Sequence, residues 1–352
     1  MFKKIKKHQD LLFQLFKVVL ITSIVSFAVS PFSCRATEEG IILIDENYSC
    51  PKIENFYVTG KNTARIVFDQ KIRLKEFSMN PEISVEKTEI SCSEIENSLC
   101  LVDVVFSENL AIGKTYNFYG EVCDNLGNSL TFSLPLLGFN AKIPDLLITE
   151  VHPKYSSGTN SSGKYFKCEY VELLALSDGN LSGLELLSAN DGAEKSFVFP
   201  AVEVAKGEII IAHFRKKEEN AVSELDSDLS LSKAKYSSDL ARDLWAENES
   251  ARLGDTSDVI VLRNSKDESI IDCVCYADVS VADWKSEEMK RTAELAVAAG
   301  KWTDASIDGA VRMEKMTATK SLERISAGNA ADCWRLSSTS GETPGILQFA
   351  LQ

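Results

Sequence analysis

The sequence predicts an all-β protein with two β-sandwich domains in tandem, the second enlarged by partly helical insertions. Three observations support this fold class. Apolar and polar residues alternate with a period of two in many short segments, as in strands with one buried face. Turn residues separate these segments at intervals of about 8–12 residues, which is typical of sandwiches. Hydrophobic residues make up 44% of the 352 residues, enough apolar mass for two cores.

The charge of the chain argues against one class of partner. The formal net charge is -14, and because the first 33 residues carry +4, the remainder carries -18. So acidic a chain is repelled by phosphate backbones, and nucleic acid is therefore an unlikely partner. A local basic patch remains open as an alternative.

Residues 1–33 are expected to be a signal peptide rather than part of the fold. Lys3 to Lys7 form a basic start, and Val18 to Val29 is an apolar run of signal-peptide length that is short for a membrane span. Lys17 limits its extension backwards. The alternative is a longer uncleaved anchor from Leu11 to Val29.

Cys34 follows Ser33 in a junction that resembles a bacterial lipobox, in which the cysteine becomes the lipidated first residue. The resemblance implies a membrane anchor at Cys34, followed by a polar tether over residues 34–49. Lipid chains of this kind hold a protein firmly to a bilayer. Ordinary cleavage after Ala36, which would discard Cys34, is the alternative. Either way, the protein is expected to be exported.

Eight cysteines remain after Cys34, and an even number in an exported chain suggests disulfides. Cys92 and Cys100 flank a short acidic loop between two expected strands, so we expect them to be paired. Eight cysteines allow 105 pairings, so the others stay open. The further candidate pairs are Cys50 with Cys123, and Cys333 with either Cys273 or Cys275.

A metal site is not expected. Cys273 and Cys275 are two apart in a strand pattern, so both thiols could reach one ion. The chain has no CxxC motif, however, and the expected mature chain has only His152 and His213. We therefore expect no structural zinc and no cofactor.

Residues 50–142 are predicted to form the first sandwich. Three segments with alternating apolar residues support it: 63–69, 101–106 and 116–122. Asp124 to Asn128 is expected to be a hairpin turn rather than a calcium site, because Asp, Asn and Gly tolerate positive φ. The order ARIVFDQKI, then LAIGKTYNFYGEVCDNLGN, resembles the Ig-like domains of bacterial surface and secreted proteins.

Residues 143–352 are predicted to form the second sandwich, joined to the first at Pro144. Tyr155 to Gly163 is expected to be a flexible Ser/Gly loop. The expected strands are Leu146 to Val151, Glu169 to Leu176, Phe197 to Pro200, Gly207 to Phe214, Asp258 to Arg263 and Ser269 to Tyr276. Leu181 to Leu186 is expected to be a turn that leads into a further strand.

A series of short motifs follows in order along this part of the chain: I-T-E-V-H-P, E-Y-V-E-L, L-S-G, F-P, K-G-E-I-I-I, S-D-V-I-V-L, I-D-C-V-C-Y, S-L-E-R and W…T-P-G. This series resembles the lamin tail domain of bacterial exported proteins. The resemblance spans about residues 145 to 347 and implies an Ig-like β-sandwich. It leaves two insertions, residues 215–250 and 279–320.

The insertions carry their own expectations. The first should hold short helices, with Trp245 packed on the sandwich. In the second, Ser286 and Gly300 suit the start and end of a helix, whose stripe Met289, Ala293, Ala296 and Val297 should pack on its own domain rather than on a partner. Leu322 to Ile325 should return to the sandwich as a strand, and Trp334 should be buried in its core. Deleting residues 281–317 should therefore leave a folded domain.

The sequence offers no convincing catalytic constellation. His152 and His213 lie outside known catalytic motifs. Glu150, Glu169 and Glu172 could be imagined as a carboxylate site, but Glu150 and Glu172 lie in strand motifs of the lamin-tail resemblance, which implies hydrogen bonding at sheet edges as their role. We therefore expect a non-enzymatic cell-envelope lipoprotein, whose Ig-like modules tether or recognise a protein or glycan at the cell surface or in the periplasm. The alternative is an accessory protein of an exported hydrolase or nuclease.

Overall fold

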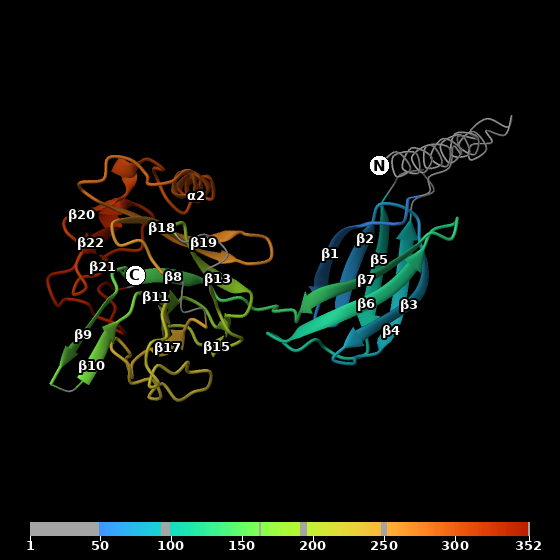
Figure 1. Ribbon diagram of the computed structural model, residues 1–352, viewed down its shortest axis with the longest axis horizontal. Coiled ribbons are helices and arrows are strands. Elements are labelled where there is room, and N and C mark those ends of the chain that lie inside the picture. Colours follow the sequence, from blue (N-terminus) through green and yellow to red (C-terminus); the bar gives the residue numbers. More distant parts are fainter. Residues whose placement is uncertain (1–48, 93–98, 162, 191–195, 248–251, 351–352) are drawn as a thin grey trace, which may run out of the picture. The chain divides into compact units, whose positions relative to one another are not determined.

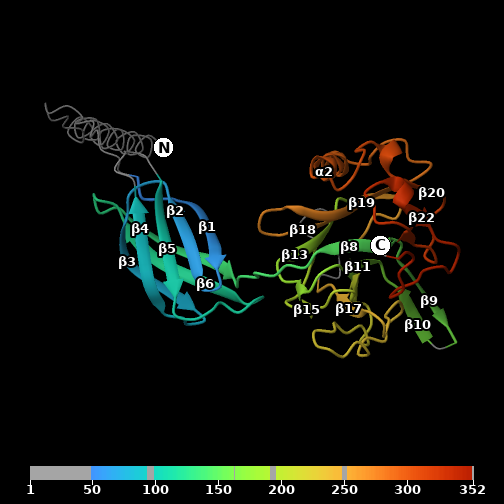
Figure 2. The same ribbon diagram turned by 180° about the vertical axis from the view of Figure 1, so that it is seen from behind.

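The computed structural model describes residues 49–92, 99–161, 163–190, 196–247 and 252–350. The described part is mostly β, as predicted (Figures 1 and 2). Its buried side chains form two large hydrophobic cores, which are described separately below. The expected signal peptide, Cys34 and nearly all of the tether lie outside the described residues. No helix among the described residues is long and apolar enough to cross a membrane.

The N-terminal sandwich has two sheets. One has the order β1-β2-β5-β4 and the other the order β3-β6-β7. The strands are β1 (Ile53–Gly60), β2 (Thr63–Phe68), β3 (Arg73–Asn80), β4 (Val85–Cys92), β5 (Cys100–Phe106), β6 (Thr115–Cys123) and β7 (Ser129–Leu137).

Alternation along these strands fills the first core, as predicted. Ile66 of β2 and Val104 of β5 are fully buried, and Phe118 of β6 lies among other phenylalanines at centroid distances of 5.0 Å to Phe77 and 5.8 Å to Phe106. Tilted and edge-on ring pairs at these distances are favourable. After β6, the Asp124 carboxylate accepts hydrogen bonds from within its own loop, which confirms a turn.

A disulfide joins Cys92 to Cys100, as predicted. The two residues are directly opposite each other on β4 and β5, which places their side chains side by side. The expected pair of Cys50 and Cys123 is wrong: both are free thiols. Cys50 precedes an edge strand of the four-stranded sheet, whereas Cys123 ends the central strand of the other sheet.

Removing this disulfide is expected to destabilise the N-terminal sandwich. On the chain-entropy model, a loop this short contributes about 2–3 kcal/mol. Urea unfolding of Cys92→Ser/Cys100→Ser should show that loss, and Cys50→Ser, which breaks no bond, is the matched control. Equal stability of the double variant and the wild type would refute the pairing.

The C-terminal sandwich has two large sheets, of order β17-β16-β11-β8-β21-β22 and β14-β13-β18-β19-β20. The strands of the first are β8 (Leu146–His152), β11 (Tyr170–Ala175), β16 (Ile209–His213), β17 (Arg242–Trp245), β21 (Leu322–Arg324) and β22 (Trp334–Leu336). Those of the second are β13 (Leu184–Ser188), β14 (Phe197–Val198), β18 (Ser257–Asn264), β19 (Ile270–Asp278) and β20 (Val311–Met313). The core between them contains fully buried side chains such as Ile148, Leu173, Leu186 and Ile260.

Two small sheets accompany the large ones: β9 (Ser156–Asn160) with β10 (Gly163–Lys167), and β12 (Gly179–Asn180) with β15 (Glu203–Val204). The first corrects the expected Ser/Gly loop over residues 155–163, because this segment supplies one strand of a hairpin. Its ladder pairs Gly158 with Tyr165, whose hydroxyl and ring lie over the glycine. Backbone hydrogen bonds need no apolar alternation, so the Ser/Gly composition concealed the strand.

Both expected insertions contribute strands to the sheets. Residues 215–250 contain no helix in their described part but supply β17, which pairs in parallel with β16. Residues 279–320 supply β20, which pairs in parallel with β19. The predicted helix is confirmed as α2 (Glu287–Ala298), which Ser286 caps and whose buried residues include Met289, Ala293 and Ala296. The described residues also include the 3-10 turns η3 (Ile307–Gly309) and η4 (Ala331–Cys333).

The C-terminal segment closes the sandwich, as predicted. β21 pairs with β8, and the Trp334 ring is buried. Arg324 is fully buried, donates to the Ile148 carbonyl at 2.7 Å and to Asp272 at 2.8 Å, and lies over the Trp334 ring.

The expected pairing of Cys333 with Cys273 or Cys275 is absent from the structure, where all three are free and buried. Cys273 and Cys275 are two apart on β19, and the Cys273 thiol donates instead to the Lys301 carbonyl at 3.2 Å. Cys333 lies in the turn that precedes β22, where Gly328 approaches its sulfur.

Candidate functional site

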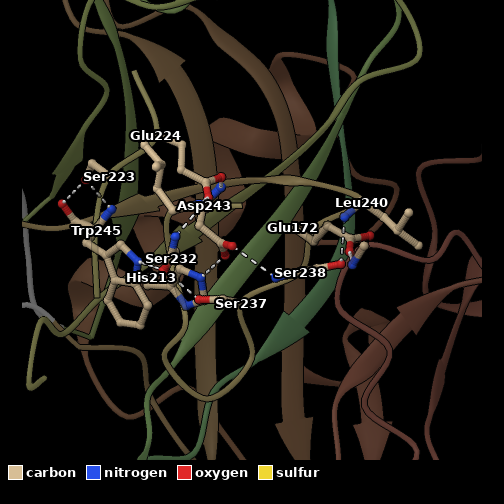
Figure 3. A network of polar contacts seen from close by, with 12 residues as sticks. Glu172, His213, Ser223, Glu224, Ser232, Ser237, Ser238, Leu240, Asp243 and Trp245 are labelled. Carbon is tan, nitrogen blue, oxygen red and sulfur yellow. Dashed lines mark hydrogen bonds and ion pairs between the residues drawn. The ribbon is translucent and has the colours of Figure 1, made fainter. Parts of the chain in front are cut away.

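His213 and Asp243 form a buried pair that resembles part of a hydrolytic triad (Figure 3). His213 Nε2 and Asp243 Oδ1 are 2.6 Å apart, and the imidazole stacks on the Trp245 ring at 3.9 Å. The other carboxylate oxygen of Asp243 accepts the Ser238 N–H at 3.0 Å. Both His213 and Asp243 are fully buried, so this pair does not contact solvent or a dissolved substrate.

Glu224 belongs to the same hydrogen-bond network, and its contacts show that the network holds an irregular segment of the chain in place. Its carboxylate accepts backbone N–H groups from Asp243 at 2.9 Å and from Leu231 and Ser232 at 3.0 Å. The Trp245 indole donates to the Ser232 hydroxyl at 3.0 Å. Because the segment between β16 and β17 has little regular structure, these carboxylates replace the backbone partners that a helix or sheet would supply.

Three glutamates lie side by side across the six-stranded sheet, where Glu172 of β11 pairs with Glu150 of β8 and Glu150 pairs with Glu323 of β21. Glu150 accepts the Thr343 N–H at 3.1 Å, and Glu172 accepts the Gly345 N–H at 2.7 Å. The two strand glutamates thus fasten the T-P-G segment to the sheet. This is hydrogen bonding of the expected kind, but at the sheet centre rather than its edge.

Burial shifts the pKa of Glu150 and of Glu172. Burial first, and then the neighbouring Glu150, raises the pKa of Glu172 to about 8. Burial also raises the pKa of Glu150, and it lowers the pKa of His152, which stacks on Tyr170, to about 4. A carboxyl whose pKa is raised on folding stabilises the protein fully below its unfolded pKa, and that contribution is lost as pH rises through the folded value.

The stability of the C-terminal domain should therefore depend on pH through Glu172. As the pH rises from about 4.5 to 8, the free energy of unfolding of the wild type should fall by about 1.4 kcal/mol per pH unit relative to that of Glu172→Gln. Denaturant unfolding of both proteins across that range measures the difference, in which the opposite contribution of His152 cancels. A difference that is constant with pH would contradict a protonated Glu172.

An open polar cleft of about 220 Å³ lies at one end of the C-terminal sandwich. Loops from both large sheets form it. In the six-stranded sheet, Lys154 and Tyr155 follow β8, Glu169 precedes β11 and Arg215 follows β16. The register that pairs Tyr170 with both His152 and His213 brings these three strand ends together.

The five-stranded sheet contributes the opposite wall. Asn190 follows β13, residues 252–255 precede β18, and Lys285 precedes α2. The cleft thus contains the cations Lys154, Arg215, Arg252 and Lys285 against the acids Glu169 and Asp255, a formal charge of +2. The formal charge of the cleft is therefore opposite in sign to the net charge of the whole chain, which is -14.

Arg215 and Tyr155 form one side of the cleft. Arg215 binds Glu169 through Nε and Nη2 at 2.6 and 2.7 Å, and its guanidinium lies 4.6 Å from the centroid of the Tyr155 ring. A cation over an aromatic face at this distance is attracted to it. Across the cleft, Lys154 bonds to Asp255 at 3.1 Å.

Buried Asp258 holds the opposite wall in place. Its carboxylate accepts the Ser188 hydroxyl at 2.5 Å, the Asn190 N–H at 3.0 Å and the Gly254 N–H at 2.8 Å. The Tyr276 hydroxyl donates to the Gly254 carbonyl at 2.7 Å. These bonds tie both cleft loops to the sheet, so this wall is formed before any ligand arrives.

The structure brings together only some of the candidate residues that the sequence indicated. Glu150 and Glu172 lie together under the C-terminal segment, whereas Glu169 lies at the open cleft with Arg215. No group of three His, Cys, Asp or Glu residues in the described part of the chain is placed to hold a metal ion. The cleft itself was missed, because its four cations come from four separate segments of the chain. Only the position of those segments at one end of the sandwich could have indicated it.

Comparisons with known proteins give a family match and distant relatives. A family model described as "protein second domain" matches residues 144–336. An uncharacterized protein of Treponema pallidum (strain Nichols) is 26% identical over 250 residues, which cover 66% of this chain and 61% of that protein. The chain thus matches less than two thirds of that relative's length.

Among solved structures, a DUF4876 family protein from Bacteroides thetaiotaomicron aligns at 12% identity with a TM-score of 0.31, over 77% of this chain and 90% of that one. The N-terminal part of the bacterial S-layer protein SbsC aligns at 13% identity with a TM-score of 0.24, over 65% and 44% of the respective chains.

Proposed function

We propose that this chain, which belongs to the family described as "protein second domain", is a non-enzymatic binding module of the cell envelope. Its C-terminal sandwich recognises a partner through the cleft at its loop end. The observation that carries this proposal is the cleft itself, in which loops from two sheets present charged side chains on a wall fixed by Asp258. Loops held by a rigid scaffold are a common place for recognition.

The burial of the chemically suggestive groups supports binding over catalysis. A general base must reach the proton that it abstracts from a substrate. His213, Asp243, Glu150 and Glu172 are all at least 98% buried and engaged with neighbouring chain. Their hydrogen bonds stabilise irregular segments, which accounts for them without a reaction.

The proposed location in the envelope rests on the sequence of the first 34 residues. A lipid at Cys34 would hold the module at a membrane surface, with the sandwiches beyond it. Cys34→Ala should then move the protein from the membrane fraction to the soluble fraction or leave uncleaved precursor. Normal processing together with retention in the membrane fraction would refute the anchor.

A binding test separates recognition from anchoring. The full-length Cys34→Ala protein should bind isolated envelopes of the cells that make it. Asn190→Trp, which fills the cleft from an exposed position, should weaken this binding at least about tenfold, a typical effect of blocking a central contact. Lys206→Trp, at an exposed position that precedes β16 at the opposite end of the sandwich, is the matched control. Equal binding by the two variants would contradict recognition at the cleft.

A further inference from the structure

We infer that the cleft binds a single acidic sugar residue, with the sugar carboxylate toward the cations and its hydroxyl groups toward Asp255 and Asn190. This inference rests on the proposed function and names its ligand class. At about 220 Å³, the cleft is smaller than the sites that hold drug-sized molecules, so it suits one compact group.

The net positive charge of the cleft favours an anionic ligand. Arg215 binds Glu169 through Nε and Nη2, and a guanidinium has more N–H donors than this pair uses. Lys154 and Lys285 bring further ammonium groups to the same cleft, and a cation hydrogen-bonded to a carboxylate forms one of the stronger polar contacts in proteins. A highly charged polymer would meet the acidic remainder of the chain, so a single charged group is favoured.

The other side chains of the cleft favour a hydroxylated ligand over a bare inorganic anion. Inorganic phosphate presents few hydroxyl donors at neutral pH, whereas a sugar acid presents several. The Asp255 carboxylate accepts from Lys154 and has further lone pairs, and the amide of Asn190 adds another acceptor oxygen. The hydroxyl groups of a sugar can donate to both. Tyr155 adds an apolar ring to the same side of the cleft as Arg215.

Ligand-observed NMR titration of the full-length protein tests this inference with four probes: glucuronate, a glucuronate-terminated oligosaccharide, glucose and inorganic phosphate. Glucuronate should bind with a dissociation constant on the order of 1 mM, as expected for so small a ligand. Glucose should bind at least about tenfold more weakly, because it lacks the charge. Tighter binding of the oligosaccharide would identify a glycan terminus as the source, and equal binding would identify the free sugar acid.

Matched variants place the ligand in the cleft. Lys154→Gln/Lys285→Gln should weaken glucuronate binding about tenfold, whereas Lys233→Gln, an exposed lysine outside the cleft, should leave it unchanged. Both cleft lysines are outside the buried core, so the double variant should fold. Phosphate binding as tight as glucuronate, equal glucose binding, or an unchanged double variant would each overturn the inference. Absence of glucuronate binding while Asn190→Trp still abolishes envelope binding would overturn the ligand class alone.

Discussion

A chain in which a short Gly/Ser bridge replaces residues 281–317 is expected to lose the folded C-terminal sandwich. This reverses the expectation from the sequence that the segment is a dispensable insertion. Its side chains Trp284, Met289, Trp302 and Met313 belong to the core of the sandwich. Removing so many large core groups exceeds the few kcal/mol by which single core truncations destabilise a domain. Thermal unfolding should show no cooperative transition for the C-terminal sandwich.

Two point variants on α2 test the same conclusion without a deletion. Met289 is buried against the sandwich, whereas Leu295 is 49% exposed on the same helix. Met289→Asp should destabilise the domain by about 4 kcal/mol or more, because it buries an unpaired charge. Leu295→Asp should change the unfolding free energy by less than about 1 kcal/mol. Similar effects of both would mean that the helix does not pack on its domain.

Arg324→Ala is expected to destabilise the C-terminal sandwich by about 3–5 kcal/mol. The guanidinium is fully buried and makes three kinds of contact: with Asp272, with the carbonyls of Ile148 and Gly328, and with the Trp334 ring. Removing it leaves a buried carboxylate without its cation and two carbonyls without a donor. Denaturant unfolding measures the loss.

A second substitution tests the cause of that loss. Arg324→Met/Asp272→Asn removes the unpaired charge but keeps an acceptor for the Ile148 N–H, which donates to Asp272 at 2.7 Å. The double variant should therefore be more stable than Arg324→Met alone. Lys233→Ala, which breaks an exposed ion pair in the same domain, should cost less than about 1 kcal/mol. If Arg324→Ala costs no more than Lys233→Ala, then Arg324 does not fasten β21 to the sandwich.

Periodic segments were predictable because a strand or helix that buries one face has apolar residues at regular intervals in its sequence. Ala64, Ile66 and Phe68 are fully buried, whereas Thr63 and Arg65, before and between them, are half-buried. Ser286 before an acidic first turn likewise predicted the start of α2, because its hydroxyl accepts the Met289 N–H. In these cases, local chemistry and tertiary packing favour the same structure.

The short parallel strands and the cleft were not predictable, because neither depends on a local pattern. β17 and β20 have 4 and 3 residues, too few to show a period, and each pairs with a strand distant in sequence. Arg215 and Asp258 acquire their roles only when strand register brings several loops to one end of the sandwich. The free Cys273 and Cys333 show the same limit, because an even number of cysteines says nothing about which thiols meet.

Site-specific photo-crosslinking in intact cells tests most directly whether recognition occurs at the loop end of the C-terminal sandwich. A photoreactive amino acid at Asn190 places the probe at the cleft. One at Lys206, which lies beside Asp178 and precedes β16 at the other end of the sandwich, is the control. The proposed function predicts a discrete adduct from position 190 and none from position 206. Adducts of equal yield from both positions, or from position 206 alone, would contradict it.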